Sequence, residues 1–231
     1  NFSFDEAESA FAAFQRAVKI PRYSVKRIER GTTPYRRPPY SFVADGFLVS
    51  GDAACLTKPS AGEGVTASMV QLEIAAEEVS RLLNEGGYLT RARLWPINTR
   101  YIAVQGRAFA GQLATLIGAL STTAEENDYF FRHDIIFSDK TFASLGRGEP
   151  LAFSAAEMLR MVLVLLGGIL TRKVRVSTIR SLLRSMKNGA RAEKLYADYP
   201  PNEAGFDAWV FRAEKFWRAC GSMAENGIGE S

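Results

Sequence analysis

Residues 46–67 read GFLVSGDAACLTKPSAGEGVTA, and this stretch decides the fold that we expect for the chain. The run Gly46–Ser50 is short and apolar, which predicts a buried strand. The strand ends at Gly51-Asp52, a loop containing Pro59 follows, and further glycines then lead into an apolar pattern of helical period. The stretch therefore predicts a strand, a loop and a helix in that order.

The helix after this loop is predicted from an apolar stripe with three- and four-residue steps. The stripe consists of Val65, Met69, Leu72, Ala76, Val79 and Leu83. Gly86-Gly87 supplies a C-cap.

The residue types in this stretch suit a ligand that carries hydroxyl and anionic groups. Asp52, at the carboxyl end of a strand, can accept hydrogen bonds from ligand hydroxyls, and Gly51 allows the backbone to come close to that ligand. Gly62 and Gly64 leave backbone N–H groups unobstructed at the first turn of the helix, whose N-terminus carries roughly +0.5 charge.

A dinucleotide fingerprint of the usual kind is excluded. Gly62–Ala67 matches G-x-G-x-x-[GA], but the first glycine of that fingerprint should follow its strand at once. Here the eleven residues Gly51–Ala61 separate the strand from the motif, and Pro59 lies among them.

The stretch instead resembles the second FAD motif of flavoproteins with the glutathione-reductase-type fold. Its usual form is a strand, G-D-A-A, a short loop with proline, and G-x-G opening a helix. In that family the aspartate binds the ribityl chain of FAD, and the helix start faces the pyrimidine edge of the flavin or the pyrophosphate. The resemblance implies FAD contacts at Gly51, Asp52, Ala53, Pro59, Gly62, Glu63, Gly64 and Val65.

Neighbouring residues narrow the resemblance to the geranylgeranyl reductase branch of these flavoproteins. Gly31–Pro34 and Asp45–Val49 precede GDAA as they do in that branch, and the likeness extends over about residues 30–85. Members reduce isoprenoid double bonds, so the resemblance implies FAD, an apolar small-molecule substrate, and an electron donor protein or NAD(P)H. Relatives that are flavin monooxygenases or electron-transfer dehydrogenases remain an alternative.

The elements that bind the ADP half of FAD in that family have no counterpart before Gly51. We therefore expect the chain to be the C-terminal part of a longer flavoprotein. This part by itself is expected to bind FAD poorly and to be inactive. The predicted fold class is α+β and mostly α: the C-terminal part of a Rossmann-like FAD-binding α/β domain over residues 1–88, followed by a helical C-terminal region over 89–231.

Composition limits the other classes of function. The 231 residues are 47% apolar and 23% charged, which excludes a disordered chain, and the mild net charge of +4 gives no reason to expect nucleic acid. One histidine, His133, and two distant cysteines, Cys55 and Cys220, predict no metal site. No catalytic side chain is assigned, because a bound flavin carries the hydride chemistry. Cys55 is interpreted as either a small buried filler or a reactive thiol beside the flavin.

Elsewhere we predict helices, apart from a short strand over Tyr23–Ile28 and an extended, proline-rich connection over Gly31–Asp45. A capping box at Ser3–Glu6 opens an apolar stripe that ends before Pro21, and Pro96 suits the first turn of a long helix over Ile97–Leu120. A second capping box at Ser154 opens an apolar helix to Leu170. A last helix capped by Asn202 carries Phe206, Trp209, Ala213, Phe216 and Cys220 on one face.

The helix that ends at Leu170 is interpreted as a buried core helix or, alternatively, as a helix lying in a membrane interface. The segment that follows, Arg172–Lys194, has eight basic residues and one acid, which gives it a net charge of +7. Peripheral membrane contact would use Arg172, Lys173, Arg175, Arg180, Arg184 and Lys187. A solvated basic face is the plainer interpretation.

Residues 1–20 show no signal-peptide pattern, so we expect a cytoplasmic protein, with membrane association left open. A non-catalytic helical module that binds a membrane or a partner is the alternative from another functional class. Two further patterns are weaker: His133-Asp134 as an acid/base pair, and an aromatic lining for an apolar tunnel. The tunnel candidates are Tyr129, Phe130, Phe131, Trp209, Phe216 and Trp217.

Overall fold

The computed structural model describes residues 4–18, 20–21, 23–29, 36–60, 62–119, 121–135, 138 and 154–221. The chain divides into two compact units, Asn1–Thr33 and Pro34–Ser231. The described residues are mostly helical, and the sheet among them is a single pair of two-residue strands. The parallel sheet of an α/β nucleotide-binding domain is not present in this described part. The boundary predicted at residue 88 remains a prediction.

The first unit contains helix α1, Phe4–Ala17, as the apolar stripe predicted. All of α1 is described and none of its side chains is buried: Phe11 and Phe14 are more than half exposed. The Ser3 half of the predicted capping box lies outside the described residues. The strand predicted over Tyr23–Ile28 is wrong, because these residues form neither helix nor strand.

The centre of the second unit is a long, continuous helical segment. Helix α3, Arg91–Tyr101, runs into a π-helical turn, Ile102–Gly106, and then into α4, Arg107–Ala119. Pro96 lies inside α3, so its predicted place in a first turn was wrong. The helix begins earlier because Thr90 caps it: the Thr90 hydroxyl accepts a hydrogen bond from the Arg93 N–H at 3.4 Å.

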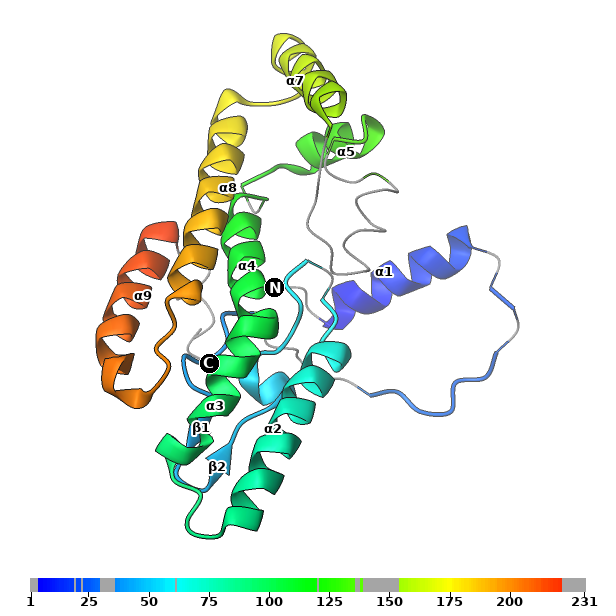
Figure 1. Ribbon diagram of the computed structural model, residues 1–231. Helices are drawn as coiled ribbons and strands as arrows, with labels where there is room; N and C mark the ends of the chain where they lie inside the picture. The colour runs from blue at the N-terminus through cyan, green and yellow to red at the C-terminus, as the bar shows by residue number, and fades with distance from the viewer. Residues whose placement is uncertain are drawn as a thin grey trace. The chain divides into compact units, whose positions relative to one another are not determined.

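Helices α8, Val176–Ala197, and α9, Phe206–Cys220, complete the main core. Helix α8 lies alongside α4 (Figure 1). The approach is close because Gly189 faces α4: a Cβ at this position would lie 2.2 Å from Thr115 Oγ1. Trp209 of α9, fully buried as its apolar face predicted, donates from Nε1 to the Leu195 carbonyl at 2.9 Å.

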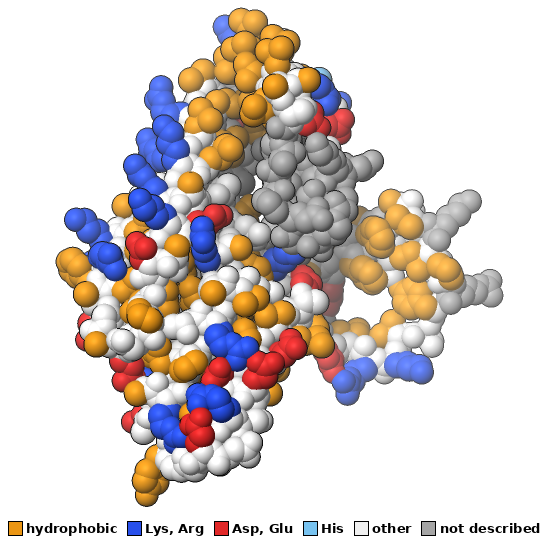
Figure 2. All heavy atoms as spheres, viewed as in Figure 1, with side chains coloured by type: hydrophobic (Ala, Val, Ile, Leu, Met, Phe, Trp, Pro, Cys, Tyr) orange, Lys and Arg blue, Asp and Glu red, His pale blue; other side chains and the backbone are white. Residues whose placement is uncertain are grey.

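A second, smaller core joins α5, Ala124–Arg132, to α7, Ala155–Leu170, and to the start of α8. A capping box opens each of these two helices: Thr123 with Glu126 opens α5, and the predicted box of Ser154 with Glu157 opens α7. The interpretation of α7 as a buried core helix was wrong, because most of its residues are exposed. Figure 2 shows hydrophobic side chains gathered at the α7 end of this view. No helix in the described residues is long and apolar enough to cross a membrane.

Helix α2, Val65–Glu85, packs along α3 with a face other than the predicted one. Its buried residues include Ala67, Ile74 and Ala75, and the predicted stripe is largely exposed, with Val65 70% and Met69 63% accessible. The inner face also holds Gln71, which is fully buried and donates from Nε2 to the Val49 carbonyl at 3.1 Å. A contact with the segment after β2 thus accompanies the choice of this face.

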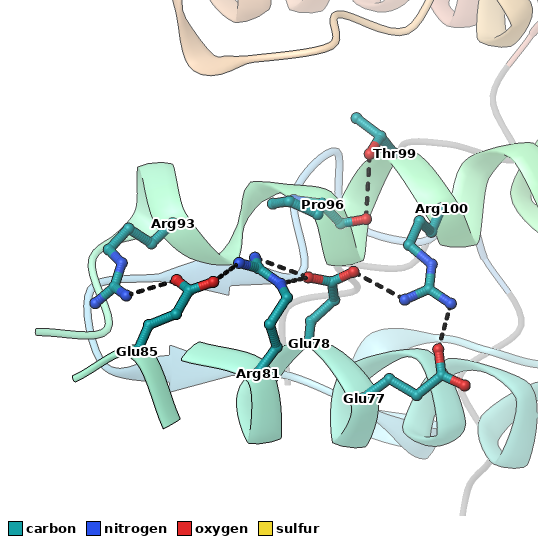
Figure 3. Close-up of polar contacts among 8 residues, drawn as sticks. All are labelled: Glu77, Glu78, Arg81, Glu85, Arg93, Pro96, Thr99 and Arg100. Atoms are coloured by element: carbon teal, nitrogen blue, oxygen red, sulfur yellow. Dashed lines mark hydrogen bonds and ion pairs between the residues drawn. The ribbon is translucent and has the colours of Figure 1, made fainter. Parts of the chain in front are cut away.

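Ion pairs tie the edges of α2 and α3 together (Figure 3). Arg100 of α3 contacts Glu77 at 2.5 Å and Glu78 at 2.8 Å, and Arg93 contacts Glu85 at 3.2 Å. Exposed pairs of this kind contribute at most about 1 kcal/mol each. Burial of apolar side chains such as Ile74 and Leu82 therefore holds α2 in place more than these ion pairs do.

The strand predicted at Gly46–Ser50 is also corrected. Strands β1, Val43–Ala44, and β2, Phe47–Leu48, form an antiparallel hairpin, and Phe47 is 57% exposed. The hairpin is attached to α3 through Asn98, which is fully buried and whose Oδ1 accepts from the Phe42 N–H at 2.8 Å. A two-residue strand replaces the longer buried one because, within the described chain, β2 pairs with β1 alone.

Candidate functional site

The Gly51–Ala54 segment forms a single 3₁₀ turn directly after the hairpin. Gly51 has φ +63°, and the Leu56 N–H closes the turn on the Gly51 carbonyl at 3.3 Å. Cys55 ends it in the left-handed region, with φ 53°. The turn buries Ala54 and leaves Asp52 and Ala53 exposed, so the carboxylate is accessible to a ligand.

The loop after this turn folds back toward the start of α2. The Lys58 N–H donates to the Glu63 carbonyl at 2.7 Å, and the Gly62 N–H donates to the Lys58 carbonyl at 2.9 Å. Gly62 has φ +68°, a conformation that favours glycine. Pro59 is buried within the loop. The loop thus returns the chain to Gly64, the N-cap residue of α2.

Asp52 and the start of α2 are neighbours. A Cβ built on Gly64 would lie 3.6 Å from Asp52 Oδ1, 3.6 Å from the Leu56 carbonyl oxygen and 3.7 Å from Thr57 Oγ1. A carboxylate, a carbonyl and a hydroxyl therefore converge on one glycine whose missing side chain leaves space among them.

Hydroxyl groups without a partner lie in the same segment. In the described part of the chain, the buried hydroxyl oxygens of Ser50, Thr57 and Ser60 have no hydrogen-bond partner. Leaving such a group unsatisfied costs about 1–3 kcal/mol, so three of them within one short segment call for an explanation. A ligand rich in hydroxyl and carbonyl groups, such as FAD, fits this composition.

Sequence reasoning missed these three hydroxyl residues. The signal that could have found them is their position: Ser50 ends the strand region before Gly51, and Thr57 and Ser60 flank Pro59 in the loop.

Glu63 already uses part of the helix N-terminus. Its carboxylate accepts from the Thr66 N–H at 2.7 Å and from the Thr66 hydroxyl at 2.6 Å. These hydrogen bonds hold the pKa of Glu63 below its ordinary value. The expectation that N–H groups of the first turn are unobstructed is therefore corrected at Thr66, and the backbone N–H of Val65 also contributes to the lowered pKa of Glu63.

Cys55 is buried, and its sulfur lies 3.4 Å from Arg36 Nε, which donates to it. Both cysteines are free thiols. The structure thus places Cys55 inside the turn rather than on the open side where Asp52 lies, which favours the interpretation of a small buried filler.

The weaker candidates do not assemble into sites. His133 is exposed, its ring lies against Tyr129 with centroids 4.3 Å apart, and Asp134 pairs with Arg160 at 3.7 Å. The aromatic residues proposed for one tunnel belong to two separate cores, with Phe130 in one and Trp209 in the other. Among the residues that the structure describes, no group of His, Cys, Asp and Glu side chains is arranged to hold a metal ion.

No family model matches the chain. The chain is 24% identical over 178 residues to the digeranylgeranylglycerophospholipid reductase of Sulfolobus acidocaldarius. The chain resembles a geranylgeranyl reductase. The aligned region covers 76% of this chain and 37% of that reductase, so the chain spans little more than a third of the length of the curated relative it matches. This similarity supports an oxidoreductase of the geranylgeranyl reductase type.

Proposed function

We propose that the chain is part of an FAD-dependent reductase that saturates isoprenoid or other apolar double bonds. The observation that carries the proposal is the convergence of Asp52, Thr57 and Gly64 at the start of α2, in a chain similar to a reductase of such lipids. When bound, FAD would supply the hydride chemistry, and the residues of this chain would bind and orient it.

Each residue of the site has a role that follows from its contacts. The exposed Asp52 carboxylate accepts hydrogen bonds from the ribityl hydroxyls, and Thr57, whose hydroxyl lacks a partner among the described residues, adds another. Gly64 presents backbone at the first turn of α2, where the absence of a Cβ keeps the approach open. Gly51 and Gly62 shape the turn and the loop.

The negative charge of Glu63 influences which part of FAD would face the start of α2. Its carboxylate lies at the helix N-terminus on Thr66, and its lowered pKa keeps it ionised at neutral pH. A second negative group at this end would be repelled, because like charges at short range disfavour each other. The neutral pyrimidine edge of the flavin is therefore the better partner for the start of α2 than the pyrophosphate.

The test is flavin binding by the protein produced from its complete reading frame. Asp52→Asn keeps the size of the side chain and removes its charge, and we expect it to lose the visible absorbance of bound flavin. Asp198→Asn is the matched control, since Asp198 is exposed at the end of α8, in another part of the unit. Wild-type FAD affinity in Asp52→Asn would refute the assigned role.

The reaction is tested with the flavin-loaded protein and an isoprenoid lipid that contains double bonds. We expect saturation of the lipid, detected as a mass increase of two hydrogens for each double bond reduced, when a chemical reductant is supplied without oxygen. Flavin reoxidation by oxygen that requires an aromatic substrate would instead identify a monooxygenase.

A further inference from the structure

Helix α7 has two apolar faces, and only one of them packs in the smaller core described above. The inner face meets the small core: Tyr129 donates from its hydroxyl to the Val164 carbonyl at 2.8 Å, and Gly168 packs against Val174. The outer face consists of Met158, Leu159, Val162, Leu163, Leu166 and Leu170. Each of these six side chains is at least 51% exposed.

The six outer residues form one continuous surface. At 100° per residue they fall within a sector about 140° wide, on the side of the helix opposite the inner face. A helix that packs in a soluble core through one face ordinarily carries polar residues on the other. The outer face of α7 therefore requires an apolar environment that the described part of the chain does not provide.

Helix α8, which starts six residues after α7 ends, adds a basic face. Its buried face, with Ser185, Gly189 and Ala192, packs toward α4. The opposite face carries cations and a shallow groove, which is lined by Val176, Ile179, Arg180, Leu183, Arg184 and Lys187. Figure 2 shows Lys and Arg side chains in a row along α8, next to the hydrophobic side chains of α7.

The cations of this face are free to meet an external anion. Within the described ranges, Arg180, Arg184 and Lys187 have no ion-pair partner, and all three are exposed. Arg175 differs, because it is held by the buried Glu126 at 2.8 Å. It therefore leaves the set of membrane-contacting residues that the sequence predicted.

We propose that the outer face of α7 and the basic face of α8, together called the α7–α8 surface, dock on an anionic lipid bilayer. Helix α7 lies in the interface with its outer apolar residues among the acyl chains, and Arg180, Arg184 and Lys187 contact lipid phosphates. Stable peripheral binding needs two signals, and this surface combines an apolar face with a cluster of cations.

Charge favours a bilayer over a second copy of the chain. In a symmetric dimer the same surface meets itself, so the cations of α8 would approach the cations of the partner's α8. An anionic bilayer supplies the opposite charge and the apolar environment together. The proposal requires no bound flavin, so its failure would leave the proposed reductase function untouched.

The test is co-sedimentation of the full chain with vesicles of phosphatidylcholine, alone or mixed with phosphatidylglycerol. We expect binding to the mixed vesicles at low salt, little binding to phosphatidylcholine alone, and weaker binding as salt is raised. Absence of sedimentation with the mixed vesicles at low salt would overturn the proposal.

Charge is tested with the triple variant Arg180→Gln, Arg184→Gln and Lys187→Gln. Each cation near an anionic surface contributes roughly fivefold to the partition coefficient, so the three together should reduce it about a hundredfold. The control removes three exposed cations elsewhere, at Arg107, Arg212 and Lys215. An equal loss in this control would show that net charge alone drives binding, which contradicts the proposal.

The apolar face is tested with Leu159→Gln, Leu163→Gln and Leu166→Gln together. Since these side chains are exposed, the helical circular dichroism should be retained while vesicle binding falls at least about tenfold. Unchanged binding would refute insertion of α7. Size-exclusion chromatography without lipid tests the alternative that a second copy of the chain covers this surface. If the wild-type protein is a dimer that does not bind vesicles, and the triple leucine variant is a monomer, the surface belongs to a dimer interface and the proposal is overturned.

Discussion

Replacing Glu126 with glutamine should destabilise the junction of α5 and α8 more than any other single neutralisation of an acid in the described residues. The Glu126 side chain is 3% exposed, and its carboxylate accepts from Arg175 Nη2 at 2.8 Å, from the Arg175 N–H at 2.9 Å and from the Thr178 hydroxyl at 2.8 Å. It also accepts from the Thr123 N–H at 2.9 Å, which closes the capping box of α5.

The size of the effect follows from these contacts. Hydrogen bonds to a charged group contribute about 1.5–3 kcal/mol each, and breaking a buried ion pair costs about 3–5 kcal/mol. In Glu126→Gln the new amide would keep one acceptor oxygen and would turn its NH₂ group toward donors. Because Arg175 is half exposed and can be solvated, we expect a loss of about 2–4 kcal/mol.

The assay is urea unfolding followed by circular dichroism, with hydrogen exchange to locate the opening. Faster exchange should appear in α5 and in the first turns of α8, because Glu126 joins these two elements. Glu125→Gln is the matched control, since Glu125 is exposed in the same turn of α5. Equal unfolding free energies for the two variants would refute the reasoning.

Acid should remove the same stabilisation. The hydrogen bonds from Arg175 hold the pKa of Glu126 far below its unfolded value of about 4.3. A carboxyl whose folded pKa is depressed contributes stability that is present above its unfolded pKa and is lost as pH falls toward the folded one. The difference between wild type and Glu126→Gln should therefore be constant from about pH 5.5 to 7 and shrink below about pH 4; no change on acidification would contradict this.

Three further predictions concern the core, the site and a thiol. Gly189→Ala would place a Cβ 2.2 Å from Thr115 Oγ1, and this overpacking should lower the free energy of unfolding by about 1–3 kcal/mol. Gly167→Ala is the control: the nearest atom is 3.9 Å away, so the substitution should leave the free energy of unfolding unchanged or raise it by up to about 1 kcal/mol. Thr57→Val removes a buried hydroxyl that has no described partner. The free energy of unfolding should therefore stay unchanged or rise by up to about 1 kcal/mol, while the affinity for flavin should fall. Burial raises the pKa of Cys220 to about 11, so mass spectrometry should show slower alkylation of this thiol at about pH 8 than of an unstructured cysteine peptide.

The helix boundaries set by caps were predictable from the sequence. Ser154 and Glu157 form the predicted box at the start of α7, and Gly86 ends α2 with φ +72°. These signals are local, since a side chain three residues away or a glycine at a helix end acts without help from the rest of the chain. Pro96 failed as a start signal because Thr90 caps the helix earlier and the surrounding core tolerates a proline in its interior.

Which face of a helix is buried was not predictable. Helix α2 carries apolar residues on more than one face: Val65 and Met69 stayed exposed, while Ala67, Ile74 and Ala75 became buried. Helix α7 likewise turned one apolar face to α5 and left the other open. Periodicity identifies an apolar face, but the shape and size of the neighbouring elements decide which face packs.

By itself, the sequence of residues 46–67 determined that an aspartate, a tight turn and a glycine at a helix start would follow one another, because glycine conformations and helix caps are local properties. Only the tertiary structure decided that the loop returns Asp52 to the side of Gly64 and leaves the hydroxyls of Ser50 and Thr57 buried without described partners. It also decided that Glu126 takes Arg175 out of the basic surface while Arg180, Arg184 and Lys187 remain exposed. Such pairings join residues far apart in the chain, and they depend on how α5 and α8 pack rather than on any local pattern.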